Sequence, residues 1–457
     1  MVILNKISLF GTLKNMYCSF MLINYKVSNF RSIESEVELD LSSSRLIGLN
    51  NRALHNSSES VVTTAAIFGG NATGKTNILL SYVWLVELAR TSLYQWTDSI
   101  PVQPFLYREG LNKPSRFEVE CEVDGLLYKY ELELDAQRVI SEKLSYWPNG
   151  RRKSLFVRDF LELSKTAREF GPTRGPKTLL ADSVLMISMA RKFDLGPVSR
   201  FAEHFIDLLA VDMQTGLNSQ VAIGEAPKAA RSGGPFAWFA DEPEGFYPSA
   251  TFEVPLSERQ SRALSLLRLA DQGISKVKVV DNEVEHQFPD GQSQKGLIRN
   301  IQIEHTVAGE EASLDLFFES RGTTKWLNLI SPILAALEYG SLILIDELDS
   351  GLHPLLVEKI LALFSDEKTN AKGAQLILTS HNTNLLNHLE PDQVWFTEKT
   401  DDGQTTLYPL LDFRSNQIAR ADQRNRQYLE GRFGGIPNLE IDIAREFTYQ
   451  TGKVKRN

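Results

Sequence analysis

The sequence has only two cysteines, Cys18 and Cys121, among its 457 residues. This scarcity argues against a disulfide framework or a cysteine-rich zinc site, and it favours a reducing, cytoplasmic setting. Runs of about 18 uninterrupted apolar residues are also missing, so no membrane span is expected. Positive charge is not in excess, because the net charge is −9 and the pI is near 5.5. The overall charge therefore gives no support for a nucleic-acid partner, although it does not report how charge is distributed.

The length of the chain indicates more than one structural unit. A chain of 457 residues exceeds the roughly 250–300 residues at which a single core stops growing, so we expect one large core with an inserted or appended part. Residues 1–20 lean apolar but are interrupted by polar residues, unlike a signal peptide, and Met21 offers a second start. We therefore expect a poorly ordered N-terminal extension over 1–20.

The stretch from Thr64 to Leu80 has the pattern of a strand, a phosphate-binding loop and a helix. Its apolar run breaks into Gly-Gly-Asn-Ala-Thr-Gly-Lys-Thr, which matches G-x-x-x-x-G-K-[ST] in full. The glycines allow backbone N–H groups to converge on phosphate oxygens, Lys75 is expected to reach the β- and γ-phosphates, and the Thr76 hydroxyl can bind Mg²⁺. A chance glycine-rich turn is the alternative. The residues expected to bind nucleotide are Gly69, Gly70, Asn71, Ala72, Thr73, Gly74, Lys75, Thr76 and Asn77.

Two adjacent acids follow a second apolar run. Ser341 to Ile345 is continuous and apolar, as expected for a buried parallel strand, and it leads into Asp346 and Glu347. Asp346 is expected to hold Mg²⁺ through water, and Glu347 to orient and deprotonate an attacking water. A strand ending in two acids is weak evidence alone, but the phosphate loop and a further apolar strand at 375–378 make it strong.

Two more segments are candidates for contact with phosphate. His381 follows the strand at 375–378, where it can contact a γ-phosphate or merely cap the next helix. Glu319 to Lys325 is a small polar turn before an apolar helix over 326–337, and such a turn offers N–H donors to an anion. Its spacing alone does not distinguish this turn from an ordinary helix N-cap.

Periodicity predicts the remaining elements. Strands are expected over 22–27, 33–41, 115–123, 126–134, 140–147, 154–157, 277–280 and 301–305, with Asp124-Gly125 as a hairpin turn. Helical spacing covers 161–170, 198–211 and 257–271, and 224–250 is expected to be a long surface loop. The predicted division is an extension at 1–20, the N-terminal half of the core at 21–158, a mainly helical insertion at 159–310, the C-terminal half at 311–410 and a tail at 411–457.

The order of these motifs resembles that of the ABC-type ATPases of the SMC and RecF kind. It is more closely similar to the stand-alone bacterial ATPases of the AAA_15/AAA_21 group, found in abortive-infection and anti-phage loci such as the AbiL type. The resemblance covers most of residues 21–440. It is carried by Asn-Phe-Arg-Ser at 29–32, Gly-Lys-Thr-Asn at 74–77, Ile-Asp-Glu-Leu-Asp-Ser-Gly-Leu-His-Pro at 345–354 and a closing motif, Tyr-Leu-Glu-Gly-Arg-Phe-Gly-Gly-Ile-Pro, at 428–437.

The resemblance implies an α/β fold, an ABC-type ATPase head with a mixed sheet around the P-loop and an antiparallel β subdomain. Lys75 and Thr76 correspond to Walker A, while Asp346 and Glu347 correspond to Walker B and the catalytic base. His381 is the implied switch histidine. The remaining implied site residues are Ser320, Gly322 and Thr323 in the signature turn, Asp349 in the D-loop and Arg31 near the phosphates.

Two departures from the family pattern limit the comparison. The signature turn has the sequence ESRGTTK and not LSGGQ. This departure is usual for the AAA_15-like group, and it argues against a transporter ATPase. No unambiguous Q-loop is present, and Gln103 is the best candidate, with a simple loop glutamine as the alternative.

The same resemblance implies an ATP-dependent switch. ATP and Mg²⁺ would be sandwiched between two subunits, giving a homodimer or a larger homo-oligomer. In an anti-phage system the ATPase would control a separate effector, such as a nuclease, because the tail at 411–457 lacks the clustered acids of a nuclease module. Two alternatives remain open. One is a DNA-binding repair ATPase, for which Arg151-Arg152-Lys153 and Arg191-Lys192 are the only dense basic pieces near the insertion; the other is a nucleotide-dependent scaffold with little hydrolysis.

Overall fold

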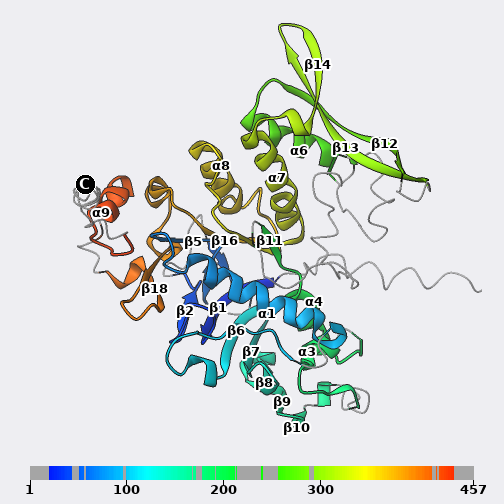
Figure 1. Ribbon diagram of the computed structural model, residues 1–457. Coiled ribbons are helices and arrows are strands. Elements are labelled where there is room, and N and C mark those ends of the chain that lie inside the picture. The colour runs from blue at the N-terminus through cyan, green and yellow to red at the C-terminus, as the bar shows by residue number, and fades with distance from the viewer. Residues whose placement is uncertain are drawn as a thin grey trace, which may run out of the picture.

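A computed structural model describes residues 20–43, 51–55, 58–95, 99–166, 168–170, 178–190, 192–211, 213, 238–239, 256–287, 293–413, 418 and 421–436 (Figure 1). The expected extension at 1–20 lies outside these residues except for Phe20, and so does the expected surface loop at 224–250 except for Trp238 and Phe239. Among the helices of the described ranges, none combines the length and apolarity that a bilayer-crossing span needs.

An antiparallel sheet forms one layer of the molecule. Its strand order is β10-β9-β8-β7-β6-β1-β2. The sharp turn between β6 and β7 follows from Asp124 and Gly125, which both have positive φ, 49° and 76°, as the predicted hairpin requires. The strands are β1 (Phe20–Ser28), β2 (Val37–Asp40), β6 (Ser115–Val123), β7 (Leu126–Leu134), β8 (Val139–Tyr146), β9 (Lys153–Asp159) and β10 (Glu162–Thr166).

A second, mainly parallel sheet carries the predicted motifs. Its strand order is β11-β15-β16-β5-β17-β18, and only the edge pair β17–β18 is antiparallel. β5, β15 and β16 are buried along their whole length, as expected for strands covered on both faces. The strands are β5 (Thr64–Gly69), β11 (Leu209–Val211), β15 (Leu342–Ile345), β16 (Gln375–Thr379), β17 (Val394–Lys399) and β18 (Thr405–Pro409).

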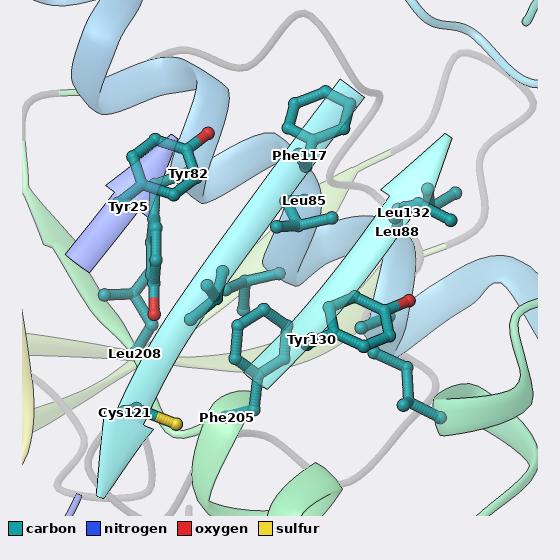
Figure 2. Packing of buried hydrophobic residues seen from close by; sticks show 14 of the residues in the cluster. Tyr25, Tyr82, Leu85, Leu88, Phe117, Cys121, Tyr130, Leu132, Phe205 and Leu208 are labelled. Carbon is teal, nitrogen blue, oxygen red and sulfur yellow. The ribbon is translucent and has the colours of Figure 1, made fainter. Parts of the chain in front are cut away.

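Helices cover both faces of the parallel sheet. Alternate residues of its strands belong to two separate apolar clusters: Ala65 and Ile67 join one, Ala66 and Phe68 the other. The first cluster holds α1 (Lys75–Gln95) between the two sheets, where its side chains pack against β6, β7 and Phe205 (Figure 2). The second cluster holds α7 (Arg321–Tyr339) and α8 (Pro354–Ser365) on the other face. This mixed α/β arrangement confirms the predicted fold class.

The segment after residue 159 differs from the prediction. Helical spacing over 161–170 predicts a helix, but the chain forms β10 and a short 3-10 turn at Arg168–Phe170. β10 pairs with β9, and β11 pairs in parallel with β15. Hydrogen bonding to a neighbouring strand decided the outcome, since a short apolar run suits a helix or a strand. The domain boundary at 159 stays a prediction. The strands β10 and β11, which follow it in the chain, belong to the antiparallel and the parallel sheet described above.

Two short helices connect this segment to the core. They are α3 (Met186–Met189) and α4 (Pro197–Phe205), and their buried residues join the first apolar cluster. The helix predicted over 198–211 therefore ends at Phe205, and the chain then enters β11. A further minor element is the antiparallel pair of β3 (Asn51–Ala53) and β4 (Ser60–Val62).

The part of the insertion that projects from the head comprises the described residues 256–287 and 293–315, and these residues are not mainly helical. It consists of one helix, α6 (Leu256–Ala270), and a three-stranded antiparallel sheet (Figure 1). The strands are β12 (Ile274–Gln287), β13 (Ser293–Val307) and β14 (Glu310–Asp315). Strands were expected only over 277–280 and 301–305, where buried Val277, Ile301 and Ile303 pack on the head. Cross-strand hydrogen bonds carry β12 and β13 far beyond this apolar patch, which periodicity alone could not reveal.

Candidate functional site

The phosphate loop joins β5 to α1 and leaves its crest open. Asn71 and Ala72 are exposed, whereas Lys75 is buried. Ala72 and Gly74 have positive φ, 62° and 105°. A Cβ at Gly74 would collide with the side chain of Thr405, so glycine is required there. The loop therefore presents its backbone at the N-terminus of a 21-residue helix, whose first N–H groups lack helical partners.

The Lys75 ammonium group is held inside this loop. Its Nζ donates hydrogen bonds of 2.9 Å to the carbonyl oxygens of both Gly69 and Gly70. Burial lowers the pKa of Lys75, and the nearby carboxylates of Asp346 and Glu347 oppose that shift. A buried cation that, among the described residues, donates its hydrogen bonds to neutral carbonyls favours an anionic ligand, because the anion would compensate its charge.

The Asp346 carboxylate links two strands to the phosphate loop. Its Oδ2 accepts a 2.8 Å hydrogen bond from the Thr76 hydroxyl, and its Oδ1 accepts one of 2.6 Å from the Thr379 hydroxyl. β16 lies between β15 and β5, so Thr379 at its end bridges the two motifs. Carboxylate and hydroxyl oxygens are the ligands that Mg²⁺ prefers, and the donor set of Asp346 and Thr76 fits this ion.

Glu347 has an unusual backbone conformation and an accessible side chain. Its φ is 47°, its N–H donates to the Thr379 hydroxyl at 2.8 Å, and its carbonyl accepts from Lys325 Nζ at 3.3 Å. His381 Nε2 lies 3.9 Å from Glu347 Oε1, and the two side chains are 39% and 54% exposed. The His381 N–H donates to both Asp349 oxygens, at 3.2 and 3.3 Å. The backbone of Glu347 is fixed by hydrogen bonds, and its carboxylate is exposed next to the His381 imidazole. This arrangement suits an acid that activates a water molecule.

The turn at 29–32 lies against the phosphate loop. Ser32 Oγ accepts from Asn77 Nδ2 at 2.7 Å and lies 2.7 Å from Thr405 Oγ1, which donates to the Thr73 carbonyl at 2.8 Å. Arg31 has a φ of 50°, and its buried Nε has no hydrogen-bond partner among the described residues. Burial also lowers the pKa of Arg31. Arg31 thus has an unsatisfied buried donor in a turn that contacts the loop through Ser32, and its guanidinium lies over the Phe30 ring, 5.8 Å from the ring centroid.

The candidate Q-loop residue contacts the same turn. The carbonyl of Gln103 accepts a hydrogen bond of 2.6 Å from the N–H of Arg31, and the Gln103 residue is exposed. This contact uses only its backbone, so the role of its side chain stays a prediction.

The signature turn caps α7 within its own chain. Ser320 Oγ accepts from the Thr323 N–H at 3.0 Å and lies 2.9 Å from its hydroxyl. Gly322 approaches the carbonyl of Gly351, to which a Cβ would come within 3.4 Å. Within the described ranges, no hydrogen bond joins Ser320–Thr323 to the phosphate loop. The structure therefore brings this turn to the D-loop and not to the P-loop of the same chain.

Three threonines of the site were not expected from the sequence. Thr379 orients both acids, Thr397 Oγ1 lies 2.7 Å from Thr73 Oγ1, and Thr405 contacts Thr73 and Gly74. Thr379 precedes His381 in the predicted motif, so its position was a usable signal. Thr397 and Thr405 carried none, because their role depends on β17 and β18 lying beside β5.

Comparisons with known proteins address which family this chain belongs to. No curated protein matches the sequence. Among solved structures, "Crystal structure of the SmcHead bound to the C-winged helix domain of ScpA" is similar, with 13% identity, 85% of this chain and 97% of that chain covered, and a TM-score of 0.36. The family model AAA_21, "AAA domain, putative AbiEii toxin, Type IV TA system", matches residues 65–188 and 203–387. Since this match spans more than half of the chain, the protein belongs to the AAA_21 family of P-loop ATPase domains.

Proposed function

We propose that this protein hydrolyses ATP with Mg²⁺ and uses the nucleotide to drive its own dimerisation. The observation that carries the proposal is the Asp346 carboxylate, which joins Thr76 of the P-loop to Thr379 and places Glu347 beside His381. The site combines two carboxylates, a hydroxyl and a buried lysine near the N-terminus of one helix. These are the groups that an enzyme transferring a phosphoryl group to water uses.

Each residue has a distinct role in this mechanism. The P-loop backbone and Lys75 bind the phosphates, and Thr76 and Asp346 would hold Mg²⁺, which supplies positive charge against the phosphate oxygens. Glu347 orients a water and takes its proton as the water oxygen bonds to the γ-phosphorus. The bond from that phosphorus to the bridging oxygen breaks, and ADP leaves with the electron pair. His381 stabilises the charge on the γ-phosphate.

The signature turn supports a second subunit in this mechanism. Ser320, Gly322 and Thr323 open the 19-residue helix α7, yet they make no hydrogen bond to the P-loop of their own chain in its described part. A helix N-terminus of this kind attracts anions. A second copy can present its turn to ATP held by the first, so two molecules would enclose two nucleotides.

Light scattering tests this proposal. Mg-ATP should raise the mass of the Glu347→Gln variant from 51.5 kDa to twice that value, because blocked hydrolysis leaves the closed dimer intact. Wild type should release phosphate, while Lys75→Ala should neither dimerise nor release it. A mass that is high without nucleotide and unchanged by it would contradict nucleotide-driven dimerisation, and absence of phosphate release by wild type would favour a scaffold.

Thr379 gives a second test of the Mg²⁺ site. Thr379→Val keeps the shape of the side chain but removes the hydrogen bonds to Asp346 Oδ1 and the Glu347 N–H. We expect the Mg²⁺ concentration for half-maximal ATP hydrolysis to rise about tenfold, since the acid loses its orientation. Thr379→Ser keeps the hydroxyl and should stay close to wild type. Equal Mg²⁺ requirements for the two variants would exclude an orienting role.

The biological role rests on the family. The family description names a putative AbiEii toxin and a type IV toxin–antitoxin system, and we infer a cytoplasmic anti-phage ATPase that controls a separate effector, such as a nuclease. Repair of DNA is less well supported, because Arg152 and Lys153, two residues of the basic piece at 151–153, pair with Glu131 and Glu169. ATP-dependent, salt-sensitive DNA binding would favour the repair function.

A further inference from the structure

The closing motif of the sequence packs on the strand next to the phosphate loop. The motif begins at residue 428 within α9 (Arg424–Leu429), and we call residues 424–436, which include α9 and the turn after it, the closing segment. β17 lies beside β5, with Thr397 paired to Gly69. The ring of Phe396 on β17 stacks on Tyr428 at 5.4 Å and 12°, and on Phe433 at 5.7 Å and 21°. The closing segment thus packs against an apolar side chain that belongs to the ATPase core.

Polar contacts hold the turn of the closing segment in one place. The Gly435 N–H donates to Glu398 Oε1 at 2.6 Å, and the Gly435 carbonyl accepts from the Tyr428 hydroxyl at 2.8 Å. The Tyr408 hydroxyl donates to the Phe433 carbonyl at 2.9 Å. Burial, together with the Glu398 carboxylate, raises the pKa of Tyr428 to about 12, so its hydroxyl stays protonated and available as a donor at neutral pH.

The closing segment reaches the phosphate loop at its first glycine. Gly435 has a φ of 66°, and a Cβ there would lie 3.4 Å from the Thr397 carbonyl and 3.7 Å from the Gly69 Cα. Thr397 continues the connection, because its hydroxyl donates to the Phe68 carbonyl at 3.3 Å and lies 2.7 Å from the Thr73 hydroxyl. One face of the phosphate loop would bind the nucleotide. The closing segment and β17 contact the loop from another side.

We propose that the closing segment positions the phosphate loop, with Gly435 and Glu398 as positioning residues for nucleotide binding. A glycine-rich loop gains affinity when it is ordered before the ligand arrives, because less conformational entropy is lost on binding. Glu398 fixes Gly435, and Gly435 limits the movement of Gly69 and Thr397. The part of the inference that concerns ATP affinity rests on the proposed function, whereas the ordering of the loop does not.

Two variants test the inference through hydrogen exchange. Gly435→Ala introduces a Cβ at positive φ against Thr397 and Gly69, and Glu398→Ala removes the acceptor of the Gly435 N–H. Both should make the amides of residues 69–76 exchange about tenfold faster in the nucleotide-free protein. Both should also weaken Mg-ATP binding about tenfold, with little change in kcat once nucleotide is saturating, because the acids that follow β15 are untouched.

Matched controls separate positioning from general destabilisation. Gly309→Ala places the same residue at a φ of 88° in the β13–β14 turn, where a Cβ meets no atom within 4 Å, so it reports only the cost of positive φ. Glu398→Gln keeps an oxygen acceptor, and it should restore wild-type exchange and affinity.

The possible outcomes are distinct. Unchanged exchange over 69–76 in folded Gly435→Ala and Glu398→Ala would overturn the inference, and so would an equal increase in Gly309→Ala. If Gly435→Ala does not fold, Glu398→Ala decides, because Glu398 is exposed and its replacement adds no side-chain atoms to the core. If wild type does not bind ATP, the proposed function fails, while the exchange measurement still decides this inference.

Discussion

Glu347→Gln should lower ATP turnover by about 10²–10³-fold while ATP binding stays close to wild type. Glutamine has the shape of glutamate but cannot take the proton of the attacking water. The backbone of Glu347 is held by Thr379 and Lys325 through its N–H and carbonyl, so the substitution should leave the local structure intact. Phosphate release and fluorescent-nucleotide titration measure the two quantities separately.

The control for this experiment is a glutamate of the same half of the chain. Glu367 lies beyond α8, is 75% exposed and lies 3.8 Å from Arg52. Glu367→Gln should therefore hydrolyse ATP at the wild-type rate. Equal turnover by wild type and Glu347→Gln would exclude Glu347 as the base. A loss of nucleotide affinity in Glu347→Gln as large as its loss of turnover would instead assign it to binding.

Arg158→Met should lower the free energy of unfolding by about 3–5 kcal/mol, because it leaves a buried carboxylate without its cation. Arg158 and Glu142 are fully buried, with Nη1 and Oε2 3.5 Å apart. Glu142 also accepts hydrogen bonds from the N–H groups of Met186 and Ile187, at 2.8 and 3.2 Å, and from the Tyr130 hydroxyl at 3.0 Å. The pair therefore holds α3 on β8 and β9. Urea unfolding measures the loss.

The loss should depend on pH in a defined direction. Burial raises the pKa of Glu142, and the Arg158 cation opposes this shift. Without Arg158, the folded protein holds the Glu142 proton to higher pH than the unfolded chain does. The stability of Arg158→Met should therefore fall as pH rises above the ordinary glutamate pKa of about 4.3.

Two further variants complete this experiment. Glu142→Gln/Arg158→Met removes both charges, keeps an amide oxygen for the N–H donors and should recover most of the lost stability. Arg116→Met breaks an exposed pair with Glu133 at 3.2 Å and should change stability by less than about 1 kcal/mol. Equal losses in Arg158→Met and Arg116→Met would show that burial of the pair has no energetic consequence.

The segments that the sequence predicted well are those whose structure depends on near neighbours. Strands over 115–123 and 126–134 and the turn between them match the prediction, because alternation and Asp124-Gly125 are local signals. Prediction was wrong over 161–170, where a neighbouring strand decided the structure, and for the mainly helical character of the projecting part. There β12 and β13 are long because they pair with each other.

The sequence by itself determined the chemistry of this protein. The phosphate loop and the adjacent acids Asp346 and Glu347 follow from contiguous residues, since glycine conformations, a helix N-terminus and a strand end are local properties. Tertiary structure decided what surrounds them: Thr379 between the acids, Thr397 and Thr405 against Thr73, and the closing segment behind Gly69. The physical reason is that strand order and pairing join residues that are far apart in the chain, 33 positions for Asp346 and Thr379 and 324 for Thr73 and Thr397, and no local pattern encodes that pairing.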